Sequence, residues 1–201
     1  MASIYDLKPA FQGLLRPLTG GLAAAGVSAN QVTLGALGLS ALGGGLVALW
    51  PEQAWPLLIL PLVLFLRMAL NAIDGMLARE HQMQSHLGAV LNELGDVFSD
   101  TLLYLPLALV PGIPALPVVL VVLLGVMVEM TGVVAVQIGA SRRYDGPMGK
   151  SDRAFLFGAL GLAAGLGLPL HPWTGALLGV MLVLSLVTVF NRARRALEEV
   201  A

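Results

Sequence analysis

Long apolar runs constrain this chain more than any other feature, because about 20 such residues are enough to cross a bilayer as a helix. The runs fall at about 31–50, 55–80, 85–109, 118–140, 153–168 and 173–191, and Asn30 is the expected N-cap of the first run. Only 11% of the residues are charged, whereas a soluble domain is about a quarter charged. The pattern predicts an all-α, polytopic membrane protein with six transmembrane helices.

The segment 3–20 differs from these runs because it alternates apolar and polar residues. Ile4, Leu7, Phe11 and Leu15 share one helical face, and Asp6 lies off that face. This pattern is typical of an interfacial amphipathic helix that lies on the membrane. Pro9 and Pro17 predict that this helix is short or kinked. We expect one domain over residues 1–201, in which the segment 3–20 precedes a six-helix bundle at 31–191.

Basic residues predict the orientation of the spans. Six spans place both termini on one side of the membrane, and every lysine and arginine except Arg67 then falls on that side: Lys8, Arg16, Arg79, Arg142, Arg143, Lys150, Arg153, Arg192, Arg194 and Arg195. The positive-inside rule therefore predicts an inner (cytoplasmic) membrane protein with both termini in the cytoplasm. The net charge of −1 does not predict a nucleic-acid partner, and the absence of cysteine excludes thiolate chemistry.

The stretch from Asn71 to Asp100 concentrates polar residues between apolar runs, and ionisable groups at membrane depth mark candidate functional sites. At about 100° per residue, two polar stripes emerge. The first holds Arg67, Asn71, Asp74 and Ala78, and the second holds Gly88, Asn92, Asp96 and Asp100. A short loop joins the two helices, so we expect the stripes to face each other. Facing rows of oxygen ligands predict a site for a hard cation such as Mg²⁺.

These residues resemble the signature of the class I CDP-alcohol phosphatidyltransferase family, Asp-x2-Asp-Gly-x2-Ala-Arg-x8-Gly-x3-Asp-x3-Asp. Its spacing is kept by Asn71, Asp74, Gly75, Ala78, Arg79, Gly88, Asn92 and Asp96. The segment from Ala29 to Thr33 also looks like the family's Pro-Asn-x-x-Thr element, with alanine in place of proline. The length and the six-helix pattern match as well, so the resemblance covers nearly the whole chain.

The resemblance implies an enzyme of phospholipid biosynthesis that acts as a homodimer among membrane lipids. A CDP-linked lipid, expected to be CDP-diacylglycerol, would donate its phosphatidyl group to the hydroxyl of a small polar or phosphorylated alcohol and release CMP. The residues that match the family signature would then lie on the cytoplasmic side of the membrane.

The resemblance also implies the site residues. One or two Mg²⁺ or Mn²⁺ ions would be held by Asn71, Asp74, Asn92 and Asp96, and Asp100, one turn beyond the signature, is a further candidate ligand. Asp96 is the expected catalytic base on the acceptor hydroxyl. The CDP moiety would lie against Gly75, Ala78, Arg79 and Gly88, of which Arg79 would meet phosphate or cytidine groups or serve only as a positive-inside anchor.

Asn71 and Asn92 depart from the signature, because they stand where the family has its first and third aspartates. An amide oxygen can ligate a metal but brings no charge. The four carboxylates of the family signature are therefore reduced to two in this chain. Three interpretations follow. The site holds one metal well and a second weakly, or Asp100 supplies a further carboxylate, or the chain is a weakened paralogue.

Basic residues in the loop before the fifth span could hold the acceptor. They are Arg142, Arg143, Lys150 and Arg153. They could bind an anionic acceptor such as glycerol 3-phosphate or the phosphates of the donor, or they could be topology charges near lipid headgroups. We interpret Glu129 as a hydrogen-bonding residue in helix packing. Arg67 could pair with Asp74 or with a lipid phosphate, or form a structural salt bridge.

Other classes of function remain open at this point. Intramembrane prenyltransferases of the UbiA type bind a magnesium diphosphate through motifs rich in asparagine and aspartate, but they resemble longer bundles with two separated motifs. A non-catalytic CDP-lipid-binding paralogue or scaffold is suggested by Asn71 and Asn92. A small transporter would more typically show paired broken helices near the bilayer midplane.

Overall fold

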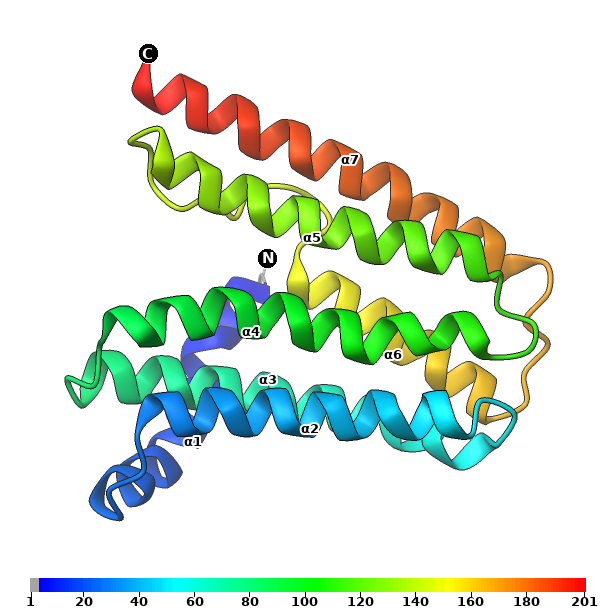
Figure 1. Cartoon of the computed structure of the whole chain (residues 1–201), viewed down its shortest axis with the longest axis horizontal. Helices are drawn as coiled ribbons and strands as arrows, with labels where there is room; N and C mark the ends of the chain where they lie inside the picture. The colour runs from blue at the N-terminus through cyan, green and yellow to red at the C-terminus, as the bar shows by residue number, and fades with distance from the viewer. Residues whose placement is uncertain (1–3) are drawn as a thin grey trace. The chain divides into compact units, whose positions relative to one another are not determined.

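The computed structural model describes the backbone of residues 4–201 and the side chains of residues 10–201 (Figure 1). This part of the chain is helical and contains no strand, which confirms the all-α prediction. The helices are α1 (Ile4–Ala24), α2 (Ala29–Leu49), α3 (Ala54–Glu80), α4 (His86–Tyr104), the 3-10 helix η1 (Leu105–Leu109), α5 (Ala115–Gln137), α6 (Lys150–Gly165) and α7 (Trp173–Val200).

Four helices, α2, α3, α5 and α7, are long and apolar enough to cross a membrane. The other two predicted spans fall on α4 and α6. Helix α4 has 19 residues, among them Glu93, Asp96 and Asp100, and α6 has only 16 residues. A helix of that length spans about 24 Å, less than the roughly 30 Å of a hydrocarbon core. Six spans therefore remain a prediction.

Helix α1 is longer than the sequence predicted. It runs through Pro9 and Pro17 as one helix of 21 residues, so it is not short, and the alternative of a kink stays a prediction. Ser3 and the side chains of Ile4 and Leu7 lie outside the described part of the chain. In the described part, Phe11 contacts Phe65 edge-on with ring centroids 6.0 Å apart. The role of α1 as an interfacial helix stays a prediction.

Helix α2 begins one residue before Asn30, so Asn30 is not its N-cap as a sequence pattern would suggest. Ser28 takes that place. The Gln31 backbone N–H donates to Ser28 Oγ at 3.3 Å, and the Ser28 N–H donates to Gln31 Oε1 at 2.9 Å. This reciprocal pair is a capping box, and it leaves the Asn30 side chain available for a contact with α4.

The helices fall into two compact units. The first unit joins α1 and the first part of α2 to residues Leu62–Ser99, which include the end of α3 and most of α4. Its core contains Ala29, Val32, Ile73 and Leu77, against which side chains of α1 pack. In this unit the paired parts of α3 and α4 are antiparallel neighbours joined by a short loop (Figure 1).

The second unit contains Leu42–Pro61 and Asp100–Ala201. Helices α5 and α7 lie side by side and run in the same direction, because α6 returns the chain between them (Figure 1). Tyr104 and Phe157 stack in its core with ring centroids 4.4 Å apart. Gly44 of α2 lies so close to α4 that a Cβ there would contact the Leu102 carbonyl group.

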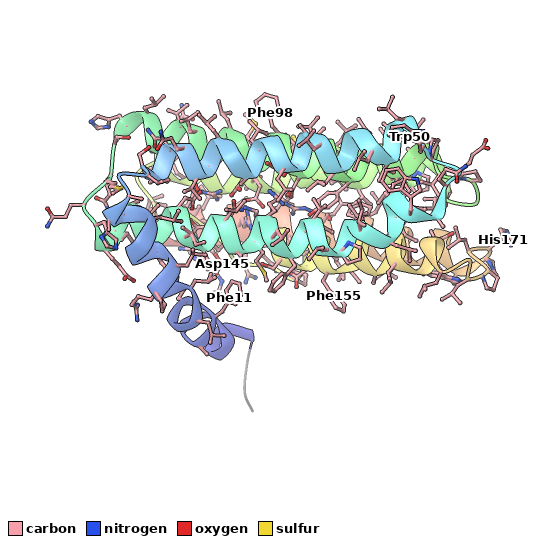
Figure 2. The ribbon with its side chains drawn as sticks, turned by 90° about the horizontal axis from the view of Figure 1, so that it is seen from below. Phe11, Trp50, Phe98, Asp145, Phe155 and His171 are labelled. Atoms are coloured by element: carbon pink, nitrogen blue, oxygen red, sulfur yellow. The ribbon has the colours of Figure 1, made fainter. Side chains whose placement is uncertain are left out.

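Large apolar side chains cover much of the outer surface of each unit. Phe98 is 57% exposed and Phe155 is 74% exposed, and both point away from their helices (Figure 2). Such side chains are unfavourable in water but suit contact with lipid tails. Trp50 directly follows α2 and Trp55 lies in the first turn of α3, with ring centroids 5.6 Å apart. Aromatic side chains of this kind suit the headgroup region. The described surface therefore fits an integral membrane protein.

We predict that Gly44→Ala destabilises the protein, because its methyl group would overlap the Leu102 backbone, which cannot rotate away. Overpacking of this kind costs about 1–3 kcal/mol. Gly45→Ala is the matched control on the same helix, since a Cβ there meets nothing within 4 Å. Thermal unfolding of both variants in detergent measures the difference, and equal midpoints would contradict the close approach.

Candidate active site

The two predicted polar stripes meet in the first unit. The Asn71 side chain on α3 donates through Nδ2 to Asp96 Oδ1 on α4 at 3.1 Å. This contact confirms that the stripes face each other. Asn92 lies one turn before Asp96 on α4 and is exposed.

Asp74 is held from a third helix. Its side chain is 5% exposed, and the Thr33 hydroxyl on α2 lies 2.9 Å from Asp74 Oδ2. The same hydroxyl lies 3.1 Å from the Ala29 carbonyl oxygen, so its single proton is shared between two acceptors. Thr33 belongs to the segment that resembles Pro-Asn-x-x-Thr, but it was not predicted as a site residue. Thr33 and Asp74 are far apart in the sequence, so no local pattern indicates that they are in contact.

Arg67 is the buried cation of this unit, with 2% of its surface exposed. Its Nη2 donates to the Asp96 backbone carbonyl at 3.2 Å and lies 3.6 Å from Asp96 Oδ1. The sequence had suggested that Arg67 pairs with Asp74 or with a lipid phosphate, or that it forms a structural salt bridge. The ion pair with Asp96 places a fixed positive charge beside the predicted base.

The predicted CDP-binding residues lie at the same end of α3 and α4. A Cβ at Gly75 would come within 2.8 Å of the Arg79 guanidinium, and one at Gly88 would come within 2.8 Å of Asn30 Oδ1. The Arg79 guanidinium thus reaches back over Gly75, and Asn30 reaches α4 at Gly88. Ala78 packs against the core of the unit instead.

This donor set fits a hard divalent cation that shares its shell with a substrate. Within residues 4–201, no three His, Cys, Asp or Glu side chains converge as a metal-binding group. Asp74 and Asp96 are the carboxylates of the two facing stripes, and a cation bound by them would need amide, phosphate or water oxygens to fill its shell. Mg²⁺ commonly binds in this way, through one or two carboxylates and substrate phosphates.

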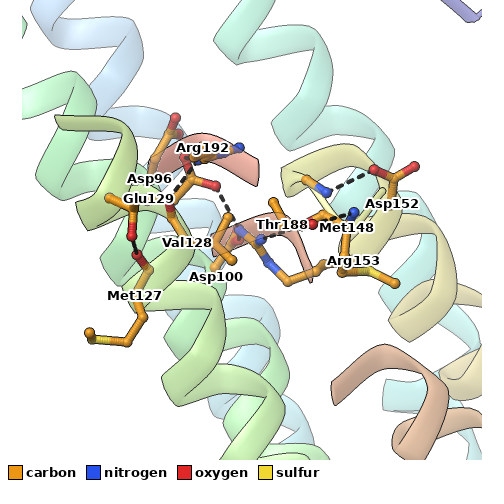
Figure 3. A network of polar contacts seen from close by, with 12 residues as sticks. Asp96, Asp100, Met127, Val128, Glu129, Met148, Asp152, Arg153, Thr188 and Arg192 are labelled. Atoms are coloured by element: carbon orange, nitrogen blue, oxygen red, sulfur yellow. Dashed lines mark hydrogen bonds and ion pairs between the residues drawn. The ribbon is translucent and has the colours of Figure 1, made fainter. Parts of the chain in front are cut away.

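Asp100 and Arg153 belong to the second unit, where internal ion pairs engage them (Figure 3). Arg153 is 1% exposed. Its Nη2 lies 2.9 Å from Asp100 Oδ2 and 3.1 Å from Glu129 Oε1. The positive charge beside Asp100 is therefore a guanidinium of its own chain.

Glu129 joins three arginines from different parts of the second unit. Besides Arg153, its carboxylate accepts hydrogen bonds from Arg142 at 3.2 Å and from Arg192 at 3.3 Å. Arg192 also donates to the Val128 carbonyl oxygen at 2.7 Å. The interpretation of Glu129 as a hydrogen-bonding residue is confirmed, but its partners are charged. Arg192 was counted only as a topology charge, and nothing in its local sequence indicated this contact.

The loop before α6 carries the remaining basic residues. Arg143 donates to Asp145 at 2.8 Å and to Glu199 at 2.6 Å. Burial opposes ionisation of Asp145, but the hydrogen bond and charge of Arg143 outweigh it and lower the pKa of that carboxyl. Lys150 is the first residue of α6. The loop therefore presents arginines that are already paired.

Comparisons with known proteins identify a family and a fold that this chain shares. Residues 27–193 match the family model described as CDP-alcohol phosphatidyltransferase. The chain is 47% identical over 195 residues to the inner membrane protein YnbA of Escherichia coli, covering 97% of this chain and 96% of that protein.

Solved structures of phosphatidylinositol phosphate synthase PgsA1 from Mycobacterium tuberculosis share the fold at 20% identity. The form with CDP-DAG bound has a TM-score of 0.70 and covers 92% of both chains. The form in complex with manganese and citrate has a TM-score of 0.74, covering 90% of this chain and 88% of that chain.

We predict that Glu129→Gln destabilises the second unit strongly, because three guanidiniums would lose the carboxylate that they share. Removing one partner of a buried ion pair costs about 3–5 kcal/mol. Glu198→Gln removes only an exposed pair with Arg194, which contributes about 0–1 kcal/mol. Thermal unfolding in detergent separates the two, and a midpoint for Glu129→Gln equal to that of Glu198→Gln would contradict the buried network.

We predict that Asn71→Asp makes stability depend on a divalent cation. The change replaces the donor to Asp96 Oδ1 by a second carboxylate, and two carboxylates at that distance repel unless a cation lies between them. The melting midpoint should fall in chelator and recover with Mn²⁺. Asn191→Asp, the same chemical change on α7, should show no such response; an equal response from both variants would argue against a cation at Asn71.

Proposed function

This chain belongs to the CDP-alcohol phosphatidyltransferase family, and we propose that it transfers a phosphatidyl group from CDP-diacylglycerol to the hydroxyl of an acceptor alcohol, releasing CMP. The observation that carries the proposal is the pair of aspartates on α3 and α4. Asp74 is oriented by Thr33 and Asp96 by Asn71. Ionisable side chains in an apolar helical unit are costly, so they are rare and commonly mark functional sites.

The proposed cation site uses Asp74 and Asp96 as charged ligands and Asn71 and Asn92 as neutral ones, with Mg²⁺ or Mn²⁺ as the ion. When bound, the ion would neutralise charge that develops on the leaving phosphate. Asp100 remains a candidate ligand. Its pairing with Arg153 favours a structural role, because that guanidinium already compensates its charge.

The reaction would need few changes in bonding. The acceptor oxygen attacks the phosphorus that carries the diacylglycerol, the bond from that phosphorus to the CMP oxygen breaks, and CMP leaves with the electron pair. The acceptor proton passes to the Asp96 carboxylate, which acts as the general base. Asn71 and Arg67 hold Asp96 Oδ1 from α3, so the carboxylate is oriented before the acceptor arrives.

The CDP moiety would bind where side chains are small. Gly75, Ala78 and Gly88 would allow a nucleotide to approach the helix backbones. The Arg79 guanidinium, which reaches over Gly75, would contact phosphate or cytidine oxygens. The Asn30 amide beside Gly88 supplies a further polar group at the same helix end.

For the acceptor, we propose a small polar alcohol that carries negative charge, such as glycerol 3-phosphate. The support comes from Arg142, Arg143, Lys150 and Arg153 in the second unit. The buried group of Arg142, Arg153 and Arg192 against Glu129 and Asp100 holds three guanidiniums and two carboxylates. An excess of one positive charge in a largely buried group favours an anion nearby.

We also propose that the chain works as a homodimer in the inner (cytoplasmic) membrane, with six spans, both termini and the active site on the cytoplasmic side. The apolar outer surface, the four candidate spans and the one-sided basic residues support this placement. The E. coli relative is itself described as an inner membrane protein.

A second candidate function is a CDP-lipid-binding protein without turnover. Asn71 and Asn92 favour it, because they remove two charges from the family signature. Such a protein would still bind CDP-diacylglycerol but would release no CMP. The two functions therefore differ in a single measurement.

We predict that the purified chain in detergent releases CMP from CDP-diacylglycerol when Mg²⁺ and the right acceptor are present. Glycerol 3-phosphate, serine, inositol phosphate and phosphatidylglycerol form the acceptor panel. Asp96→Asn should lower the rate about 100-fold or more, as expected for loss of a general base. Glu52→Gln, an exposed carboxylate in the turn between α2 and α3, is the control and should leave the rate unchanged.

Two outcomes would overturn parts of this proposal. Full activity in a folded Asp96→Asn variant would remove Asp96 from the role of base. Binding of CDP-diacylglycerol without CMP release for any acceptor would favour the non-catalytic alternative.

A further inference from the structure

We infer that Arg67 is a built-in positive charge of the cation site, so that the site takes one divalent ion per chain rather than two. The inference rests on the proposed function, because that function requires the ion. It concerns a residue outside the family signature. Arg67 lies one helical turn before Asn71 on α3 and is 2% exposed.

The first step is the position of the guanidinium. Arg67 Nη2 contacts both the backbone and the side chain of Asp96, at 3.2 Å to the carbonyl oxygen and 3.6 Å to Oδ1. Both contacts cross from α3 to α4, so the charge is fixed by two elements of the same unit. A buried arginine stays protonated, and its charge therefore acts on any cation that Asp96 binds.

The second step is the charge balance. With Asp74 and Asp96 ionised, the two carboxylates and Arg67 carry a net charge of −1 before any metal binds. Asn71 and Asn92 add oxygen atoms but no charge. Asp100 adds no free charge, because Arg153 pairs with it at 2.9 Å within the second unit. One divalent cation would change the net charge of Asp74, Asp96 and Arg67 to +1, which suits the binding of a diphosphate. Two divalent cations would change that net charge to +3.

The third step is the orientation of Asp96. The same oxygen, Oδ1, accepts the Asn71 hydrogen bond at 3.1 Å and faces Arg67. One hydrogen-bond donor and one neighbouring positive charge at that oxygen take the place of a second cation between two carboxylates. Arg67 is thus a positioning residue, whose charge replaces an ion and keeps Asp96 aligned.

The test counts ions and does not depend on turnover. The full-length protein in detergent is titrated with Mn²⁺, and free Mn²⁺ is followed by electron paramagnetic resonance. We expect one bound Mn²⁺ per wild-type chain. Two ions of similar affinity, or none, would overturn the inference, and this count needs no variant.

The variants test the charge itself. Arg67→Met removes the positive charge, so it should bind Mn²⁺ about tenfold more tightly or acquire a second ion, because a neighbouring unit charge changes cation affinity by that order in a partly buried site. Arg67→Lys keeps the charge and should match the wild type. A folded Arg67→Met with unchanged or weaker Mn²⁺ binding would show that Arg67 has only a structural role.

CMP release from CDP-diacylglycerol, measured in parallel, separates the two proposals. One ion with no release would leave the inference standing while the proposed reaction fails. Two ions with release would reject the inference and keep the reaction.

Discussion

Pairing of buried charge is the constraint on which the rest of this structure depends. The chain is mostly apolar, and ionised groups inside it are stable only where partners surround them. In the first unit, Arg67 and Asn71 both engage Asp96. In the second unit, Glu129 draws together arginines from the loop, α6 and α7. The helices can therefore pack only in registers that bring these partners together.

The two units use charge differently. In the first unit, the neutral hydroxyl of Thr33 holds Asp74, and Asn71 together with one arginine, Arg67, holds Asp96, so an incoming cation and diphosphate can still change the balance. The second unit satisfies its carboxylates with guanidiniums of its own. The first arrangement suits binding and chemistry, and the second suits a rigid support. Family membership adds the reaction class, but the distinction comes from the contacts themselves.

Sequence periodicity predicted the helices well, because the length and the periodicity of apolar runs are local properties. It also predicted that Asn71 would face Asp96, since one short loop fixes the pairing of α3 with α4. It failed for the cap of α2, where a plausible Asn30 competed with a better Ser28 and Gln31 pair. It also missed the contact of Thr33 with Asp74 and that of Arg192 with Glu129. Those partners are 41 and 63 residues apart, and no local pattern reports them.

The position of Glu129 has a consequence for how the protein is made. During synthesis, the Glu129 carboxylate is made before the three arginines that pair with it. These arginines then become available one after another, in the order of the sequence. Arg142 follows after 13 residues, Arg153 after 24 and Arg192 only after 63. The last partner lies on α7, so the cluster is complete only after residues 129–192 have all been synthesised. Assembly of the second unit therefore requires α7, and a chain that stops before Arg192 lacks one of the three guanidiniums that neutralise Glu129.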